Sequence, residues 1–315
     1  MRRILLACLS FMVCASVDAQ TFPSKTIRLV SGVSPGAASD TMARMLAEKL
    51  SARVGVTVIV ENKLGAGGIV AAKFVAQAEP DGHVISIYTS AFTIAPILNP
   101  GTLDAAGLQP VAMLGTVPTV LVANPAKYKT LDDLVNAARA KPGGLVGANA
   151  GIGSSTHMNL ERFRLAAGLT FLNLPMKGPS EAITEVITGR ADLYFAPVFS
   201  VEKFVQAGSL AALAVGSPKR SALFPNLPTT LEAGYPNSDY NFWIGALVSS
   251  RTPRSIVQRL NAEFTAVLQL PEVKESMRTL GVDPFPQSID EFEALIKREL
   301  DENAQLVKTA GIKLN

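Results

Sequence analysis

The sequence predicts an α/β protein of two lobes, with two mostly parallel sheets flanked by helices and joined by a two-segment hinge. Short apolar runs alternate with amphipathic stretches of helical length, which is typical of parallel sheets covered by helices. Two long apolar runs, near residues 117–124 and 241–249, bracket the middle of the chain. The chain would cross there into a second lobe and later cross back, and a hinged two-lobed body is a ligand clamp. A single large sheet with an insertion is the alternative that this pattern leaves open.

The N-terminus has the features of a cleavable signal peptide. Arg2 and Arg3 are followed by an apolar run over residues 4–15, and Val17 and Ala19 are the small residues expected at a cleavage site. We expect cleavage after Ala19 and export to the periplasm. A membrane anchor is disfavoured because the run is shorter than the about 20 apolar residues that span a bilayer. A lipoprotein box ending at Cys8 would lie too early in the segment.

Composition narrows the function classes. The chain has 315 residues, of which 48% are hydrophobic and 17% charged, so it is globular and long enough for two domains. The formal net charge is +3 and no basic cluster alternates with aromatic residues, so nucleic acid is not expected as a partner. Both cysteines, Cys8 and Cys14, lie in the signal segment. The mature chain would therefore have no disulfide, catalytic thiolate or cysteine-bound metal.

The first domain is expected to comprise residues 20–121 and 242–315, after the signal peptide at 1–19, with a second domain at 122–241. Residues 26–30, 56–61 and 84–89 read as strands, and residues 39–53 and 69–78 read as the helices between them. Ser39 is a candidate N-cap for the first helix. A segment rich in proline and glycine covers 95–110, and residues 111–124 form one long apolar run.

The middle of the chain repeats the alternation of strands and helices. Thr130 is a candidate N-cap for a helix that ends near Pro142. Strands are expected at 145–148, 170–174, 192–196 and 210–215, and helices at 157–167, at 181–188 and after Pro197. A loop-rich segment at 217–238 leads to the apolar run 242–249. Helices at 253–268, 272–280 and 288–308 close the chain, the last with a capping box of Ser288 and Glu291.

Three loops of small or hydroxyl residues lie between a strand and a helix: 34–40, 151–156 and 177–180. Ser90, after the third strand, is a weaker fourth. If the helix N-termini converge on the cleft, their backbone N–H groups would bind a carboxylate or amide without any arginine. The alternative for each single loop is ordinary loop chemistry, since small residues are common before helices.

Most of the polar side chains in these loops have two interpretations. Asp40 could contact a ligand ammonium group or stabilise the dipole of the first helix. Ser155 and Thr156 could cap a helix or donate to a ligand, and His157 could donate to an anion. Lys177 could neutralise a bound carboxylate or be a solvated loop residue.

Motifs of other functions are missing from the sequence. The glycines at 65–68 do not have dinucleotide-binding spacing, and there is no phosphate-binding Gly-Lys-Ser/Thr loop. No nucleophile elbow occurs, and no paired histidines suggest zinc. We therefore expect no cofactor, no metal and no enzymatic activity.

Several motifs together resemble the Bug-type receptors, the periplasmic solute-binding proteins of tripartite tricarboxylate transporters. They are Phe22-Pro23-Ser24-Lys25-Thr26-Ile27-Arg28-Leu29-Val30, the loop to Asp40, residues 60–68, Pro80-Asp81-Gly82-His83, Leu227-Pro228-Thr229, Glu232-Ala233-Gly234 and 310–314. The resemblance covers essentially the whole mature chain, in order. It implies a type II periplasmic-binding fold in which strand-to-helix loops grip a ligand carboxylate, largely through backbone groups and bridging waters.

Carried over to this chain, the ligand-binding positions of the family lie in both lobes. They are Gly36, Ala37, Ala38, Asp40, Ser90, Ser155, Thr156, His157, Lys177, Gly178, Pro179 and Ala196. The chain departs from the family where Val33 replaces the usual Phe, Ala37 a Gly, and Met176 a Tyr. Because these positions alter the cleft wall, the ligand can differ from the familiar dicarboxylates of the family.

The expected function is capture of a small carboxylate-bearing metabolite, or a related amide or aromatic acid, in the interdomain cleft. The expected partners are this small molecule and the membrane components of a tripartite tricarboxylate-type transporter, with the receptor itself a monomer. The alternatives are a ligand-sensing partner of a membrane signalling protein and an enzyme of the same bilobal fold.

Overall fold

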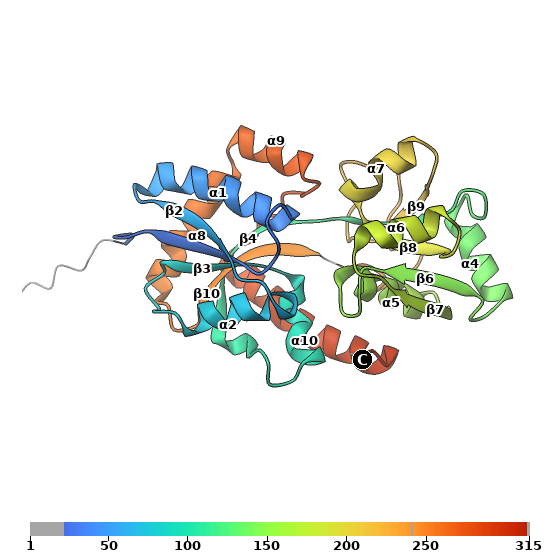
Figure 1. Cartoon of the computed structure of the whole chain (residues 1–315), viewed down its shortest axis with the longest axis horizontal. Coiled ribbons are helices and arrows are strands. Elements are labelled where there is room, and N and C mark those ends of the chain that lie inside the picture. Colours follow the sequence, from blue (N-terminus) through green and yellow to red (C-terminus); the bar gives the residue numbers. More distant parts are fainter. Residues whose placement is uncertain (1–21, 241, 314–315) are drawn as a thin grey trace, which may run out of the picture.

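The computed structural model describes residues 22–240 and 242–313, which form two separate five-stranded sheets (Figure 1). The predicted signal peptide lies outside the described residues. We call the part around the first sheet lobe 1 and the part around the second sheet lobe 2. The separate sheets confirm the predicted two-lobed α/β fold, so the alternative of one large sheet was wrong.

The sheet of lobe 1 has the strand order β2-β1-β3-β10-β4. β1 pairs in parallel with β2 and β3, whereas β10 pairs antiparallel with β3 and β4, so four strands run one way and one runs the other. The strands are β1 (Ile27–Ser31), β2 (Val58–Asn62), β3 (Val84–Thr89), β4 (Leu108–Thr116) and β10 (Trp243–Ser249).

The sheet of lobe 2 repeats this arrangement in the order β7-β6-β8-β5-β9. β6 pairs in parallel with β7 and β8, and β5 is the single antiparallel strand, between β8 and β9. The strands are β5 (Thr119–Ala123), β6 (Leu145–Asn149), β7 (Phe171–Pro175), β8 (Leu193–Pro197) and β9 (Ala211–Val215).

The two reversed strands, β5 and β10, are the strands that follow the crossings between the lobes. β4 ends at the edge where the chain leaves lobe 1, and β5 enters lobe 2 from the facing edge, so β5 must run against its neighbours. The same holds for β10 after β9. The apolar run 111–124 is therefore two strands in two sheets, divided at Pro118. The division into domains stays a prediction; β5, a strand of the second sheet, begins at Thr119, two residues before the predicted end of the first segment at 121.

Helices cover both faces of each sheet. In lobe 1, α1, α8 and α9 pack on one face and α2 and α10 on the other, while in lobe 2 α4 and α5 oppose α6 and α7. The bounds are α1 (Ala38–Val54), α2 (Ile69–Gln77), α3 (Ala95–Leu98), α4 (Leu131–Ala140), α5 (Ser155–Ala166), α6 (Pro179–Ile187), α7 (Val198–Gln206), α8 (Arg254–Leu268), α9 (Pro271–Thr279) and α10 (Ile289–Ala310). Short 3-10 turns are η1 (Ala66–Gly68), η2 (Ser90–Thr93) and η3 (Ala105–Gly107).

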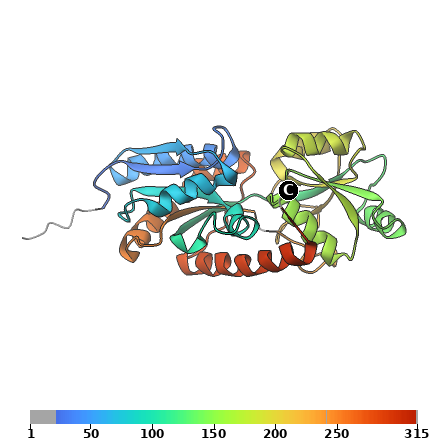
Figure 2. The same ribbon diagram turned by 60° about the horizontal axis from the view of Figure 1, so that its bottom comes forward.

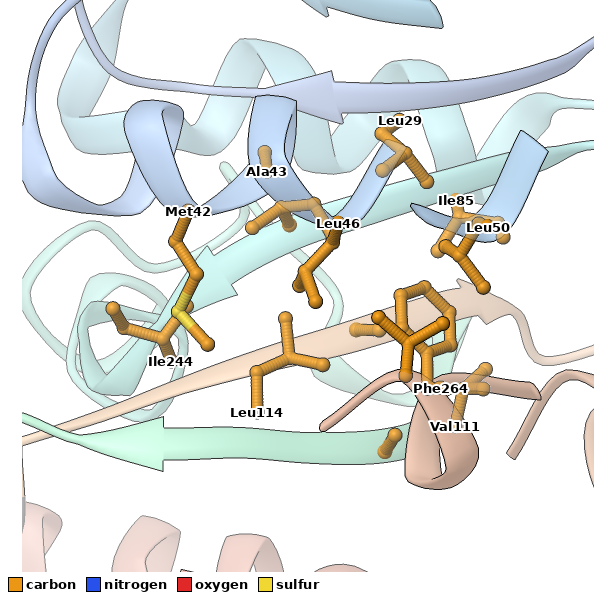
Figure 3. Packing of buried hydrophobic residues seen from close by; sticks show 14 of the residues in the cluster. Leu29, Met42, Ala43, Leu46, Leu50, Ile85, Val111, Leu114, Ile244 and Phe264 are labelled. Atoms are coloured by element: carbon orange, nitrogen blue, oxygen red, sulfur yellow. The ribbon is translucent and has the colours of Figure 1, made fainter. Parts of the chain in front are cut away.

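Local sequence signals explain where several helices begin. Thr130 and Asp133 form a capping box at α4, and Ser288 and Glu291 form another at α10, as predicted. The N-cap of α1 is Ala37 and not Ser39, because the helix starts one residue before the serine. Figure 3 shows Met42 and Leu46 of α1 packed toward Leu114, Ile244 and Phe264 in the core of lobe 1.

Helix α10 links the two lobes on one side of the molecule. Figure 2 shows it running along lobe 1 toward lobe 2, where its end meets α5. Leu306 and Ile312 pack there in one apolar cluster with Met158 and Tyr240. Among the described residues, no helix is long and apolar enough to cross a membrane.

Candidate functional site

Both sheets turn the carboxyl ends of their parallel strands toward the crossing between the lobes. Thr89, the last residue of β3, pairs with Ile244 near the start of β10. In lobe 2, Thr119 at the start of β5 pairs with Pro197 at the end of β8. Because only two residues separate β4 from β5, these strand ends of the two lobes lie close together. We call the place where they meet the shared edge. The loops after β1, β2 and β3 therefore face those after β6, β7 and β8.

The loop after β1 presents backbone groups rather than side chains. Gly36 has a φ of 86°, in the left-handed region that glycine tolerates, and the loop leads into α1 at Ala37 and Ala38. Ala37 has no side chain that could cap the helix, so no cap hydrogen bond satisfies the first N–H groups of α1. An uncapped helix start is suited to an anion.

Asp40 is fully buried and its carboxylate is occupied by the protein. Oδ2 accepts hydrogen bonds from the Gly36 N–H at 3.0 Å and Arg44 Nε at 3.0 Å. Oδ1 accepts from Arg44 at 3.2 Å and from Asn62 Nδ2 at 2.7 Å. A carboxylate has about four lone-pair sites. All are used, which favours the structural interpretation of Asp40 over contact with a ligand ammonium.

The pKa of Asp40 follows from the same contacts. Burial by itself would raise the pKa, but the hydrogen bonds from Arg44, Asn62 and the Gly36 N–H outweigh it, so the pKa lies below its usual value. Asp40 thus stays ionised and holds the Gly36 backbone against the start of α1.

Glycines allow the loops after β1 and β2 to meet. A Cβ atom at Gly32 would lie 2.5 Å from the Cα of Gly68, and a Cβ at Gly68 would lie 2.3 Å from the ring of Tyr88. Real side chains do not fit at such distances, so the loop of residues 65–68 is placed against the first loop.

Ser90 lies directly after β3 and is completely buried. Its Oγ has no hydrogen-bond partner among the described residues, and neither has the hydroxyl of its neighbour Tyr240, a residue of the returning segment. Burial, and after it the charge of Glu299, raises the pKa of the Tyr240 phenol, while the Ser90 hydroxyl lowers it. Ser90 and Tyr240 therefore place two neighbouring hydroxyl groups, with no other hydrogen-bond partner among the described residues, beside the shared edge.

The loop before α5 uses its hydroxyl groups to hold itself together. Ser154 Oγ accepts from the His157 N–H at 3.3 Å, and Thr156 Oγ1 accepts from the Ala150 N–H at 2.9 Å. The Ser154 and Thr156 hydroxyls also lie 3.0 Å apart. Ser155 is the first residue of α5 and has no side-chain contact of this kind in the described part of the chain.

His157 is buried and both of its ring nitrogens are engaged. Nδ1 accepts from the Gly153 N–H at 3.1 Å, and Nε2 lies 3.0 Å from Asn173 Nδ2. Burial lowers the pKa of the imidazole, against an opposing effect of Glu161, so the neutral form is favoured. His157 also lines a cavity of about 630 Å³ with the end of α10. Its observed role is to brace the loop.

The remaining predicted residues lie at the start of α6 and in β8. The Lys177 N–H donates to Glu181 at 3.1 Å, whereas its exposed ammonium forms no ion pair with any residue the structure describes. Gly178 precedes α6 and Pro179 is its first residue. Ala196 is buried in β8, opposite Val120, and is one residue from the shared edge.

Three residues that the sequence did not single out lie next to the predicted loop residues and contact them. Asn149 ends β6, accepts from the Gly151 N–H at 2.9 Å and donates to Asn173. The Tyr194 hydroxyl is buried beside Thr156, and the Tyr240 hydroxyl is buried beside Ser90; neither hydroxyl bonds to any other described residue. The position of Asn149, a polar residue ending an apolar strand before a glycine loop, was the one available sequence signal.

Comparison with known sequences gives a consistent result. The profile of a family described as the tripartite tricarboxylate transporter family receptor matches residues 42–312. The protein BugT of Bordetella pertussis is 32% identical over 311 residues, which cover 96% of this chain and 94% of BugT.

Solved structures are similar over nearly the whole chain. The periplasmic binding protein BugD is 29% identical with a TM-score of 0.75, covering 93% of this chain and 99% of BugD. Rpa4515 of R. palustris, solved with adipate, is 28% identical with a TM-score of 0.78 and covers 93% of this chain and 99% of its own. MatC of Rhodopseudomonas palustris, solved with bound malate, is 26% identical with a TM-score of 0.74 and covers 91% of this chain and 100% of its own.

Proposed function

Since the chain belongs to the receptor family of tripartite tricarboxylate transporters, we propose that it captures a small carboxylate in the periplasm for the membrane components of such a transporter. The observation that carries this proposal is the shared edge, where loops from both lobes present backbone donors and the hydroxyl of Ser90. Similar receptors have been solved with adipate and malate. The predicted cleavage after Ala19 and a monomeric receptor are parts of the same proposal.

The site is proposed to bind and not to catalyse. A hydrolytic site needs a nucleophile beside a free general base. His157 is the imidazole nearest to the loop hydroxyls, and its ring contacts Gly153 and Asn173 instead. The hydroxyls of Ser154 and Thr156 are likewise used inside the loop.

The Ser90→Ala variant tests the site, because the substitution should have little effect on the stability of the fold. Removing an unpartnered hydroxyl changes the free energy of unfolding by less than about 0.5 kcal/mol, whereas a lost hydrogen bond to a ligand carboxylate weakens binding about tenfold or more. Isothermal titration with malate, adipate and a panel of other carboxylates and amides measures this. Ser86→Ala is the matched control: the Ser86 side chain is also buried and has no hydrogen-bond partner among the described residues, but it lies within β3, in the middle of the sheet.

Two results would contradict the proposal. One is that no carboxylate or amide binds or raises the melting temperature, although a ligand in large excess must stabilise the folded state. The other is that Ser86→Ala and Ser90→Ala weaken binding equally, which would show that the loss does not arise at the shared edge.

A further inference from the structure

A buried polar network joins α10 to the segment that carries Ser90. Glu299 of α10 accepts hydrogen bonds at Oε2 from Trp243 Nε1 at 2.8 Å and from Thr93 Oγ1 at 3.1 Å. Trp243 begins β10 and Thr93 ends η2, the turn whose first residue is Ser90. All three residues are buried, and Glu299 has 4% of its surface exposed. Glu299 is therefore one hydrogen bond and one turn of chain away from the hydroxyl that the proposed function uses.

The hydroxyl of Thr93 has three polar neighbours and only one hydrogen to donate. Asn303 Nδ2 donates to Thr93 Oγ1 at 3.0 Å, so the hydroxyl oxygen is the acceptor in that contact. The hydrogen of the hydroxyl can then go to the Ser90 carbonyl at 2.9 Å or to Glu299 Oε2 at 3.1 Å. These two acceptors therefore compete for a single hydrogen.

The charge on Glu299 decides this competition. An ionised carboxylate is a stronger acceptor than a backbone carbonyl, since charge-assisted hydrogen bonds are about twice as strong as neutral ones. An ionised Glu299 draws the Thr93 hydrogen away from the Ser90 carbonyl, whereas a neutral carboxyl group leaves it there. The neutral form of Glu299 therefore keeps the bond that fixes η2 at Ser90, and the ionised form weakens it.

The charge of Glu299 also acts on the hydroxyl groups beside the shared edge. The Tyr240 and Ser90 hydroxyls are neighbours, and after burial the negative charge of Glu299 contributes to the raised pKa of the Tyr240 phenol. A carboxylate bound beside these hydroxyls would meet the same negative charge in a buried setting, where charges are poorly screened. This repulsion has the same sign as the effect on Ser90, because both favour a bound carboxylate when Glu299 is neutral.

We propose that Glu299 is a positioning residue for the carboxylate site: its neutral form fixes Ser90 through Thr93, and capture of a carboxylate takes up a proton at Glu299. The inference rests on the proposed function, because it concerns the same site. Since linkage is reciprocal, a carboxylate that prefers the protonated receptor also raises the affinity of the receptor for that proton. The receptor thus holds its ligand more tightly in mildly acidic surroundings than in alkaline ones.

Glu299 titrates in a range where this control can act. Burial raises its pKa to about 7, against the hydrogen bonds from Trp243 and Thr93 and the charge of Arg162, while the charge of Glu302 raises it further. Glu299 also lines a cavity of about 990 Å³ between α5, α10 and the segment 236–240. This cavity gives the buried carboxyl group a route for proton exchange with solvent.

The surroundings of Glu299 contain few other groups that change charge near pH 7. The elements η2, α3, β4 and β10, which lie next to it, carry no charged residue. The chain has two histidines. Burial lowers the pKa of His157, so its neutral form is favoured, and His83 lies before β3, at the edge of the sheet opposite to the shared edge. The charged or titratable groups that share the cavity with Glu299 are Arg162, Asp239, Tyr240, Arg298, Asp301 and Glu302.

Isothermal titration of the purified protein with malate and with adipate at pH 6.5, 7.5 and 8.5 tests the proposal. If the bound carboxylate makes the proton of Glu299 about tenfold harder to remove, affinity falls about fivefold between pH 6.5 and pH 8.5. Titrations at pH 7.5 in buffers of different ionisation enthalpy should show uptake of about half a proton for each bound carboxylate. Wild-type binding without a pH dependence and without proton uptake would overturn the proposal, and this result needs no variant.

Glu299→Gln should remove the pH dependence, because the Gln side chain stays neutral and its oxygen still accepts from Trp243. At pH 8.5 this variant should bind malate about fivefold more tightly than wild type, by the same linkage. His83→Gln is the matched control: it removes a titratable group at the opposite edge of the sheet and should keep the wild-type pH profile. A pH dependence that persists in Glu299→Gln would contradict the proposal.

Thr93→Val tests the path from Glu299 to Ser90. The variant lacks the hydroxyl that bonds to the Ser90 carbonyl, so it should lose more affinity at pH 6.5, where that bond is kept, than at pH 8.5. An equal loss at both pH values would show that Glu299 does not act through Thr93 and would refute the positioning role. If no carboxylate binds at any of the three pH values, the proposed function itself fails, so the two failures are distinguishable.

Discussion

Replacing Asp40 with Asn should destabilise the fold and weaken ligand binding only indirectly, through the loosened backbone of Gly36. The Asn amide has one acceptor oxygen, so in either orientation its NH₂ group meets two of the four present donors. Breaking a buried ion pair costs about 3–5 kcal/mol. Arg44 is half exposed and can be hydrated again, which reduces the expected loss to about 2–4 kcal/mol.

Denaturant unfolding of the ligand-free protein measures this loss, and titration with a carboxylate measures binding. Asp132→Asn is the matched control, because Asp132 also lies in the first turn of a helix, α4, but is exposed. It should cost only the helix-dipole contribution, about 0.3–1 kcal/mol. If Asp40→Asn unfolds like wild type and loses affinity, the carboxylate contacts the ligand and our reasoning is refuted.

Two further predictions concern charge. Glu299 binds its proton more tightly in the folded state, because its pKa rises from 4.5 to about 7, so wild-type stability should fall as pH rises from 4.5 to 7 and level off above. Relative to wild type, Glu299→Gln should gain on the order of 3 kcal/mol between pH 4 and 8 in urea unfolding, and an unchanged difference would contradict the buried-acid assignment. Lys177→Gln should weaken carboxylate binding about 3- to 10-fold at low salt, an effect that high salt reduces, with unfolding unchanged. Lys141 lies before β6, at the end of the lobe 2 sheet away from Lys177. Lys141→Gln should therefore change neither carboxylate binding nor unfolding, and equal losses of affinity in both variants would show a general charge effect.

The order of elements could be predicted from the sequence because each is encoded locally. Capping residues such as Thr130 and Ser288 act within one helical turn, and the alternation of apolar runs and helices fixes the class of fold. The direction of β5 and β10 is not local. It depends on which edge the chain enters after a crossing, and residues 111–124 therefore read as one run although Pro118 divides them between two sheets.

The sequence predicts which loops form the candidate site, but it does not predict what each side chain does there. The sequence places Asp40, Thr156 and His157 beside helix starts, where an inward or an outward side chain is equally possible. Their partners, Asn62 for Asp40 and Asn173 for His157, come from neighbouring strands, and only the folded sheet brings them within hydrogen-bond distance. Ser90 and Tyr240 lie 150 positions apart in sequence and meet at the returning segment.

These contacts suggest how a site built from small residues can be rigid. In both lobes the polar side chains of the loops bond to the loops themselves: Asp40 holds Gly36, Thr156 holds Ala150 and His157 holds Gly153. The side chains are thereby used to fix backbone conformation, which reduces the ordering that a ligand must impose. In the proposed function, recognition of the carboxylate would then depend on backbone N–H groups and on the hydroxyl of Ser90. Substitutions such as Val33 and Ala37 can reshape the wall of such a site without disturbing the groups that hold it.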